Sequence, residues 1–327
     1  MPTQKQKKAD VTATCGYCKQ KGSFSLYDTE DMYGDKFQVH QCVQCQAMYL
    51  HPRPTAAQLE RAYSESYYGE QDDKFSPFIE KVLDFFRGKR ARLIKKYVAA
   101  PAKVLDIGCG NGRFLQYLLK EGNYEAFGVE LAGKAAERAA AIPQINLKKG
   151  RLEHGDFEAE SLDAITLFHV FEHLDEPIET LEIASKILKK DGILLMSFPN
   201  IDSLQSKMFK GKWLHLDPPR HLFFFKPKDF VNEMKSYGFE LVKETHFCTE
   251  QNPFGMQQSL LNLMNKKREL LYEHLKGNKE YVNGHSKVSL FAQRSFFTLS
   301  YPLFVISDAI ESALGKGATV EFVFRKK

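Results

Sequence analysis

The sequence contains no apolar run long enough to cross a membrane. In its C-terminal part, the longest uncharged apolar run extends from 295 to 307 and includes Pro302, whereas a spanning helix needs about 20 apolar residues. Residues 1–8 are polar and basic, so we expect no secretory signal. These absences predict a cytoplasmic protein without a transmembrane segment.

The sequence also has little net charge. It carries 46 basic and 41 acidic residues, which gives a formal net charge of +5. This balance gives nucleic-acid binding little electrostatic support, and we expect no nucleic-acid partner. Internal repeats and low-complexity tracts are absent, and the apolar fraction of 43% is ordinary for a globular protein. The chain of 327 residues is long enough for one large domain with additions.

A glycine-rich loop stands out against this ordinary background. A short apolar run, 104–107, leads into Gly108, Gly110 and Gly112, and an amphipathic helical pattern follows until Gly122. Glycines let the backbone adopt left-handed angles and let a ligand approach the main chain closely. The N–H groups at the start of the helix favour a carboxylate or phosphate.

The spacing of this loop narrows the class of ligand. Asn111-Gly112-Arg113 replaces the Gly-Lys-Ser/Thr of a phosphate-binding P-loop, and the dinucleotide pattern G-x-G-x-x-G is also absent. Asp106 precedes the first glycine, and Glu130 ends a second apolar run at 126–130. An acid at the tip of the second strand is placed to accept the hydroxyls of a ribose. The pattern therefore indicates a cofactor that carries a nucleoside.

From residue 101 onward, predicted strands alternate with predicted helices, which is typical of a parallel sheet with helices on both faces. We expect strands at 104–107, 126–130, 145–147, 162–168, 193–198, 239–245 and 319–325, and a helical insertion at about 255–316.

Two Cys-x-x-Cys pairs precede this domain. Cys15 and Cys18 are followed by a hairpin-like segment and then by Cys42 and Cys45. Paired knuckles at this separation are typical of a closed tetrahedral zinc site, in which the metal is structural. Disulfides are the alternative, and they fit poorly with a chain without an export signal.

The resulting domain prediction has three parts. Residues 1–54 form a zinc-ribbon module with a basic tail, 55–100 a helical cover and 101–327 the main domain with its insertion. We expect Thr55 to cap a short helix, with Tyr63, Tyr67 and Tyr68 after it. A longer helix begins at Ser76-Pro77 with Phe78 and Ile79 on its apolar face, and the pattern indicates an interruption near Gly88.

Candidate catalytic residues follow the fourth expected strand. His169, Glu172 and His173 lie just beyond it, on the rim that also carries Gly108 and Glu130. Arg220 and His221 are candidates for the acceptor pocket, because they lie in a loop that begins at Trp213 and follows the fifth strand. The alternative is that Glu172 and His173 pin the following turn, and that aromatic packing fixes the loop.

Several motifs in this order resemble class I S-adenosylmethionine-dependent methyltransferases. They are Asp106-x-Gly108-x-Gly110-x-Gly112, Glu130, Asp163-Ala164-Ile165-Thr166, Gly192-Ile193-Leu194-Leu195, His169-Val170-Phe171-Glu172-His173-Leu174 and Phe198-Pro199-Asn200. The last two resemble the branch with ubiquinone-type O-methyltransferases and sugar or natural-product methyltransferases, some of which carry a zinc ribbon. The resemblance covers residues 100–245.

The resemblance implies a Rossmann-like α/β fold, with a seven-stranded, mostly parallel sheet, and S-adenosylmethionine as cofactor. The three glycines would wrap the methionine end of the cofactor, and Glu130 would hold the ribose. The implied cofactor site comprises Asp106, Gly108, Cys109, Gly110, Gly112, Glu130, Leu131, Leu152 and Phe168. Arg151 stands where many relatives have an aspartate, so we expect an adenine contact through the backbone around Leu152.

The leading hypothesis is methyl transfer to oxygen or carbon of a natural-product, sugar or quinone-like acceptor. A hydroxyl acceptor must lose a proton, and a histidine suits that task. His173 is the first candidate for the base, His169 the second and His221 the third, with Glu172 orienting a ring or sharing a divalent ion. We expect the helical insertion to form a lid or a contact between two copies.

Three alternatives stay open at this point. The ribbon could dock a macromolecular substrate such as RNA or a carrier protein. The chain could be a nicotinamide-dependent oxidoreductase, although it lacks the G-x-G-x-x-G pattern. A non-enzymatic zinc scaffold is the third.

Overall fold

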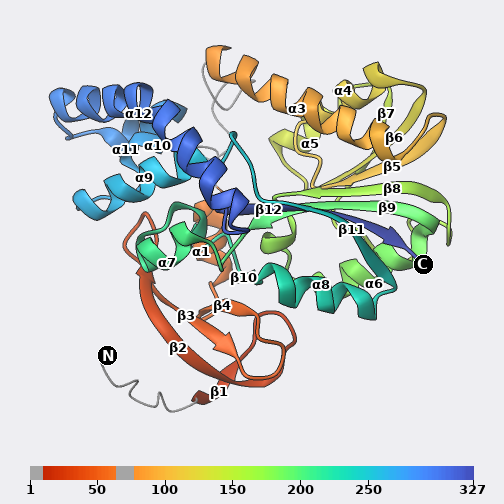
Figure 1. Ribbon diagram of the computed structural model, residues 1–327, viewed down its shortest axis with the longest axis horizontal. Helices are drawn as coiled ribbons and strands as arrows, with labels where there is room; N and C mark the ends of the chain where they lie inside the picture. The colour runs from red at the N-terminus through yellow and green to blue at the C-terminus, as the bar shows by residue number, and fades with distance from the viewer. Residues whose placement is uncertain (1–9, 64–76) are drawn as a thin grey trace.

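The computed structural model describes residues 10–63 and 77–327, which contain two β-sheets (Figure 1). The larger sheet contains β5 (Ala102–Ile107), β6 (Tyr124–Glu130), β7 (Ile145–Lys149), β8 (Leu162–Phe168), β9 (Leu188–Pro199), β11 (Phe239–Thr245) and β12 (Thr319–Lys326). Their order in space is β11-β12-β9-β8-β5-β6-β7. Only β12 runs antiparallel to its neighbours, β9 and β11. The prediction of a seven-stranded, mostly parallel sheet is therefore confirmed.

Helices cover both faces of this sheet, as the alternating pattern predicts. Helices α3 (Pro77–Tyr97), α4 (Arg113–Glu121) and α5 (Lys134–Ala140) lie on one face, and α6 (Pro177–Ile187) and α8 (Pro227–Ser236) lie on the other (Figure 1). Val104 and Leu105 on β5 are fully buried, one in each of the two core layers. A central strand buried on both faces explains its continuous apolar sequence.

Helix α3 corrects one expectation. It continues through Gly88 without the interruption that the sequence pattern indicated. A glycine inside a helix costs only about 1 kcal/mol, and packing against α4 outweighs that cost. Gly88 faces α4 closely, because an added Cβ would lie 3.6 Å from Tyr117 Cδ1. The expected start at Ser76, and the side chains of Phe78 and Ile79, lie outside the described residues.

The smaller sheet forms the ribbon, in red in Figure 1. Its strands are β1 (Asp10–Thr14), β2 (Lys21–Glu30), β3 (Lys36–Cys42) and β4 (Met48–His51), all antiparallel. The expected hairpin between the two cysteine pairs is thus confirmed as β2 and β3. A fifth strand, β10 (Phe223–Phe224), comes from the main domain and pairs with β4. The ribbon sheet is therefore completed by a strand that comes much later in the sequence, after β9.

A short helix, α1 (Ala56–Ala62), follows the ribbon. Thr55 caps it in a reciprocal capping box with Gln58, as the sequence predicts. Tyr63 is the residue directly after the helix, and its side chain reaches His173 at the rim of the large sheet. Tyr67 and Tyr68, which were expected to follow it, lie outside the described residues.

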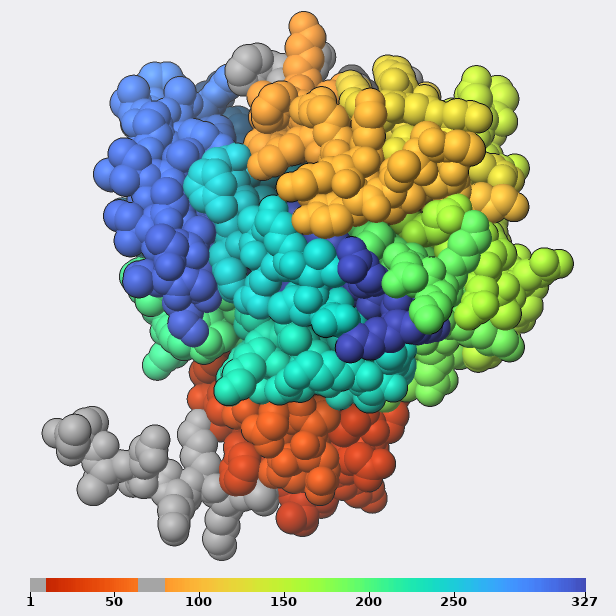
Figure 2. Space-filling model, turned by 45° about the vertical axis from the view of Figure 1, so that its right-hand side comes forward, coloured from red at the N-terminus to blue at the C-terminus, as the bar shows by residue number. Residues whose placement is uncertain are grey.

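The segment between β11 and β12 is helical, as predicted. It contains α9 (Asn252–Met264), α10 (Leu270–Lys276), α11 (Lys279–Val282) and α12 (Lys287–Ala313). These helices pack beside the ribbon and its neighbouring loop, and Arg268 donates to the carbonyl oxygens of Glu30 and Gly211, both at 2.7 Å. Figure 2 shows α12 in blue along one side of the molecule and the ribbon in red below it.

The outer face of α12 is apolar and exposed. Val288, Leu299 and Leu303 are 76%, 82% and 63% exposed. Among the helices within residues 10–63 and 77–327, none is long and apolar enough to cross a lipid bilayer.

Candidate active site

The glycine loop joins β5 to α4 at the carboxyl edge of the sheet. Gly108, Gly110 and Gly112 all have positive φ angles, of 71°, 57° and 74°. A Cβ on Gly108 would lie 2.5 Å from Val170 Cγ2, whereas a Cβ on Gly110 would meet no atom of the described part of the chain within 4 Å. The loop is therefore packed tightly at its first glycine and open at its second, which leaves room for a ligand against the backbone of Gly110.

Glu130 lies at the tip of β6 and faces this loop. Its Oε2 accepts a hydrogen bond from Gly110 N at 2.7 Å, and its Oε1 accepts one from Leu131 N at 3.1 Å. Each carboxylate oxygen has a further lone pair for a ligand hydroxyl. Burial raises the pKa of Glu130, and these two backbone hydrogen bonds oppose that effect.

Asp106 lies beneath the loop on β5. Its carboxylate is buried and accepts a hydrogen bond of 2.6 Å from Thr166 Oγ1. Burial raises its pKa to about 7. Among the residues that the resemblance adds, Cys109 and Leu152 are buried, Phe168 is half-buried and Leu131 is 57% exposed. Arg151 forms an ion pair with Asp175.

These groups fit S-adenosylmethionine. Among the described residues, an open position at Gly110 and the half-buried carboxylate of Glu130 on the neighbouring strand match what the methionine and ribose parts of the cofactor require.

His169 and Glu172 follow β8 on the same rim. The backbone of His169 has a positive φ of 56° and is held by a hydrogen bond from its N–H to Ser197 O at 2.8 Å. Its Nδ1 lies 3.5 Å from Glu172 Oε1, and its side chain is 23% exposed. Glu172 lies in the short 3-10 helix η1 (Phe171–His173) and is buried. Burial alone would raise its pKa, but the surrounding histidines lower it overall.

The loop after β9 brings His221 to the same place. This loop contains α7 (Leu204–Phe209) and the 3-10 helices η2 (Lys210–Lys212) and η3 (Leu214–Leu216), and the fully buried Trp213 anchors it. The N–H of Leu222 donates to Glu172 O at 2.8 Å, which joins the loop to η1. His221 Nε2 lies 3.9 Å from Glu172 Oε1.

Arg220 is fully engaged beside His221. Its guanidinium binds both carboxylate oxygens of Asp217 and donates to Ala62 O at 3.3 Å. Burial would raise the pKa of Asp217, but the charge of Arg220 lowers it to about 2. The ion pair between Arg220 and Asp217 holds the loop against α1. The sequence did not predict this role for Asp217.

His173 faces His221, with ring centroids 4.5 Å apart. Its Nδ1 lies 2.9 Å from Tyr63 Oη and 3.1 Å from Arg220 O. Burial lowers its pKa to about 4. The contact with Tyr63 was not predicted, and its only signal in the sequence is the position of Tyr63 directly after the capped helix.

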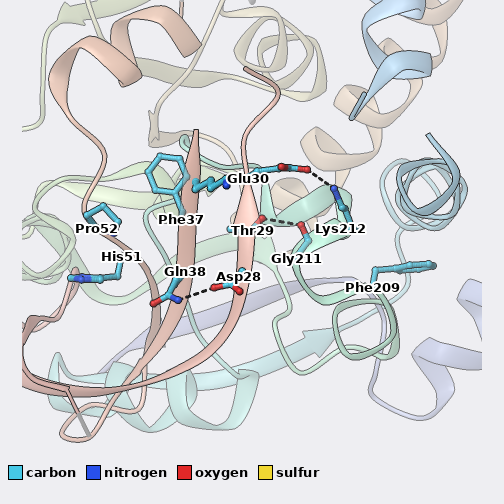
Figure 3. A pocket seen from close by; sticks show the side chains of 11 residues that line it. Asp28, Thr29, Glu30, Phe37, Gln38, His51, Pro52, Phe209, Gly211 and Lys212 are labelled. Atoms are coloured by element: carbon cyan, nitrogen blue, oxygen red, sulfur yellow. Dashed lines mark hydrogen bonds and ion pairs between the residues drawn. The ribbon is translucent and has the colours of Figure 1, made fainter. Parts of the chain in front are cut away.

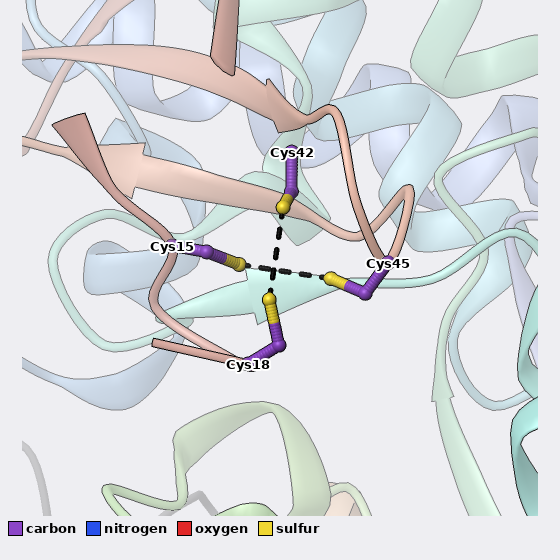
Figure 4. A group of neighbouring side chains, drawn as sticks. All are labelled: Cys15, Cys18, Cys42 and Cys45. Carbon is purple, nitrogen blue, oxygen red and sulfur yellow. Dashed lines mark hydrogen bonds between the residues drawn. The ribbon is translucent and has the colours of Figure 1, made fainter. Parts of the chain in front are cut away.

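The four cysteine sulfurs converge in the ribbon (Figure 4). The Sγ atoms of Cys15 and Cys45 are 3.7 Å apart, as are those of Cys18 and Cys42. All four are free thiols, so the disulfide alternative does not hold. Thiolates about 2.3 Å from a tetrahedral ion lie about 3.8 Å apart, so the donor set fits zinc.

A separate hollow of about 660 Å³ lies where the ribbon meets η2 (Figure 3). Lys212 and Glu30 form an ion pair across it, and Thr29 Oγ1 donates to Gly211 O at 2.8 Å. The glycine loop, His169, His173 and His221 do not line this hollow, whereas His51 of the ribbon does.

The chain is similar in sequence to known methyltransferases. The chain is 28% identical over 168 residues to the ubiquinone biosynthesis O-methyltransferase of Haemophilus ducreyi, an alignment that covers 43% of this chain and 71% of that protein. The protein of the same name from Actinobacillus pleuropneumoniae serotype 5b is 27% identical over 191 residues, covering 50% and 77%. A solved SAM-dependent methyltransferase from Archaeoglobus fulgidus is 21% identical, with coverage of 76% and 98% and a TM-score of 0.46.

Fold and loop together define a class I S-adenosylmethionine-dependent methyltransferase. The model of the methyltransferase domain family matches residues 78–244, which is more than half of the chain, and the chain therefore belongs to this family. This membership favours methyl transfer over the nicotinamide-dependent alternative.

Proposed function

We propose that the protein transfers the methyl group of S-adenosylmethionine to oxygen or carbon of a small acceptor of the natural-product, sugar or quinone-like kind. The observation that carries this proposal is the placement of Glu130 at the tip of β6 and of His169 and Glu172 just beyond β8 on one rim. The names of the two relatives, which methylate oxygen in ubiquinone biosynthesis, support a small acceptor.

The cofactor side of the proposed site is the glycine loop. The backbone at Gly108, Gly110 and Gly112 receives the methionine end, and Glu130 accepts hydrogen bonds from the ribose hydroxyls. Asp106, Cys109, Leu131, Leu152 and Phe168 complete this side of the site.

The bound cofactor supplies an electrophilic methyl group on a sulfonium. The chain must align the acceptor and, for a hydroxyl, remove its proton. We place the base at His169, because its side chain is partly exposed and Glu172 Oε1 lies 3.5 Å from its Nδ1. His173 ranks below it, because burial lowers its pKa to about 4 and thereby weakens it as a base.

The ribbon is proposed to hold one structural zinc ion through Cys15, Cys18, Cys42 and Cys45. Four thiolates leave no open coordination position, so the ion would not take part in the reaction. We further propose that 1–54, 55–100 and 101–327 act as ribbon, cover and methyltransferase domain. Pairing of two copies through α12 stays a prediction, which its exposed apolar side chains support.

The proposal is tested by incubating the purified protein with S-adenosylmethionine and a panel of phenolic, quinol and sugar acceptors. Mass spectrometry should detect S-adenosylhomocysteine together with one methylated acceptor. Turnover only with RNA or a carrier-bound substrate would instead favour a ribbon that docks a macromolecule. A protein that binds no S-adenosylmethionine would refute the proposal.

A further inference from the structure

Glu321 is a half-buried carboxylate without a partner. It lies near the start of β12, which is antiparallel to β9 and therefore begins at the edge of the sheet where β9 ends. Within the described part of the chain, no group donates a hydrogen bond to its carboxylate, and no lysine, arginine or histidine forms an ion pair with it. Removing a carboxylate from water without such a partner is costly, so this position indicates a ligand.

Glu321 belongs to a row of side chains across four strands. Phe168 of β8 lies opposite Ser197 of β9 in the register of the sheet. Ser197 in turn lies opposite Glu321, and Glu321 lies opposite Thr245 of β11. Residues directly opposite each other on neighbouring strands point to the same face of a sheet. Phe168 packs against the core layer that includes Ala91 of α3, so the whole row faces α3.

Ser197 is a second polar group without a partner in this row. It is only 6% exposed, and its Oγ forms no hydrogen bond with any residue that the structure describes. A buried hydroxyl can both donate and accept, so it usually has at least one partner. Two neighbouring positions with unpaired polar groups therefore indicate a site for a polar ligand.

The nearby cations do not pair with Glu321. Arg90 of α3 lies over the ring of Phe168, 5.2 Å from its centroid, and its ion pair is with Glu250. Lys243 lies on the same face of β11, but it forms no ion pair with Glu321. Burial raises the pKa of Glu321, and the charges of Arg90 and Lys243 oppose that effect from beyond ion-pair distance.

The row begins beside the proposed base. His169 directly follows Phe168, and its N–H donates to Ser197 O at 2.8 Å. Glu130 lies on β6, on one side of β8, whereas Glu321 lies two strands beyond β8 on the other side. Neighbouring strands are about 4.8 Å apart, so Glu321 is about 10 Å from β8. An acceptor whose methylated atom lies at His169 would therefore present a different group to Glu321.

We propose that Glu321 binds a hydrogen-bond donor of the acceptor, a hydroxyl or a protonated amine, that is not the group being methylated. Ser197 offers a second polar contact on the same face. The inference rests on the proposed methyl transfer, and it narrows the acceptor to polar molecules with at least two donor groups, such as sugars and amino sugars. An acceptor with one hydroxyl and an otherwise apolar skeleton would leave the carboxylate unpaired and would be disfavoured.

The test uses two series of probes in which only the second donor group changes. One series is tyramine, tyrosol and 4-ethylphenol, and the other is 4-aminocyclohexanol, cyclohexane-1,4-diol and cyclohexanol. In each series the second group is an amine, a hydroxyl or absent. Affinity for the complex of the protein with S-adenosylhomocysteine is measured by saturation-transfer NMR, and methylation is measured by mass spectrometry.

The wild type should bind an amine or hydroxyl probe at least about tenfold more tightly than the matched probe with neither, as expected of a hydrogen bond to a charged group. Glu321→Ala should abolish this preference. Glu321→Gln should lose it more for the amine than for the hydroxyl, because a neutral amide oxygen still accepts a hydrogen bond. A preference that is larger for the amine identifies a cationic acceptor, and equal preferences identify a polyhydroxylated one.

Glu240→Gln is the matched control. Glu240 is exposed, pairs with Lys327 and lies at the opposite edge of the sheet, so its loss of charge should leave the preference unchanged. Where a probe is methylated, Glu321→Gln should raise its KM with little change in kcat, because Glu321 is distant from the transferred methyl group. Circular dichroism checks that each variant is folded, and Glu321→Gln keeps the shape of the side chain.

Three results would overturn the inference alone. They are equal affinity of the wild type for all members of a series, an unchanged preference in Glu321→Ala, and failure of the complex to bind any amine or hydroxyl probe. Each of them is compatible with a protein that binds S-adenosylmethionine and methylates another acceptor. Failure of the wild type to bind the cofactor would instead refute the proposed function, and this inference with it.

Discussion

The proposed cofactor side of the rim comes from one continuous stretch of chain, whereas the proposed acceptor side is assembled from distant segments. On the cofactor side, the N–H of Gly110 reaches Glu130 across a single strand–helix–strand unit. On the acceptor side, Tyr63 meets His173 across 110 positions of sequence, and the loop that carries His221 pairs with ribbon strand β4.

Because of this difference, a substitution on one side of the rim should leave the structure of the other side intact. The conformation of the glycine loop depends on the positive φ angles of its glycines and on hydrogen bonds to β6. The acceptor side depends instead on the ribbon, because Leu50 N donates to Leu222 O at 3.1 Å and β10 pairs with β4. Variants should therefore fall into two groups, according to whether cofactor binding or only turnover is lost.

The largest effect is expected for Cys42→Ser. Structural zinc in comparable sites contributes about 10–16 kcal/mol, so the variant should lose its ribbon zinc and the order of the ribbon. Methyl transfer should be lost with it, while affinity for the cofactor changes little. Metal analysis, hydrogen exchange and calorimetry measure these three outcomes. Cys248→Ser is the control, because Cys248 lies outside the cluster. A loss of cofactor affinity equal to the loss of activity would show that the two sides are not separable.

His169→Asn should affect turnover alone. Asparagine tolerates the positive φ at this position better than alanine does, so the backbone is preserved. Loss of a general base lowers kcat by about 10²–10⁴-fold. Steady-state kinetics should show this fall with an unchanged Kd for the cofactor. Normal turnover in the folded variant would move the base to His173 or His221, or indicate a carbon acceptor that is already nucleophilic.

Glu130→Ala should weaken cofactor binding, whereas His169→Asn should lower turnover alone. It removes charge-assisted hydrogen bonds to the ribose, each of which contributes about 1.5–3 kcal/mol. We expect the cofactor Kd to rise at least tenfold by calorimetry. Glu125→Ala serves as control, because Glu125 lies on the same strand but is half-exposed and pairs with Lys103. An unchanged Kd in Glu130→Ala would contradict the ribose assignment.

Asp106 makes the stability of the cofactor side depend on pH. Its pKa is raised by burial from 3.8 to about 7, so between these values the folded state holds a proton that the unfolded state has lost. Its contribution to stability is complete below pH 3.8 and is lost as the pH rises through about 7. Relative to Asp106→Asn, the free energy of unfolding of the wild type should fall by about 1.4 kcal/mol per pH unit in this window. Urea denaturation at several pH values measures this difference, and parallel curves for the two proteins would contradict it.

The same contrast explains what the sequence could predict. The positions of Gly108 and Glu130 follow from local patterns, namely apolar runs, glycine spacing and an acid at a strand tip. The cysteine ribbon was predictable for the same reason, because each knuckle is a local motif. The convergence of Tyr63, His173 and His221 was not, because it depends on how β10 joins the ribbon and on how Arg220 pairs with Asp217.

The continuity of α3 is a smaller example of the same limit. A glycine at 88 weakens a helix in isolation, and only the contact with α4 explains why the helix continues. The helical content between β11 and β12 was predictable from apolar spacing. The contact between Arg268 and the backbone of the ribbon hairpin was not, because nothing near Arg268 in the sequence indicates that partner.

The most direct test of the central claim is a calorimetric titration of the wild-type protein with S-adenosylmethionine, alongside a titration with a nicotinamide dinucleotide. The account predicts saturable binding of one S-adenosylmethionine per chain and no binding of the dinucleotide. Binding of the dinucleotide alone, or of neither ligand by the folded protein, would contradict the assignment of the glycine loop and Glu130 to this cofactor.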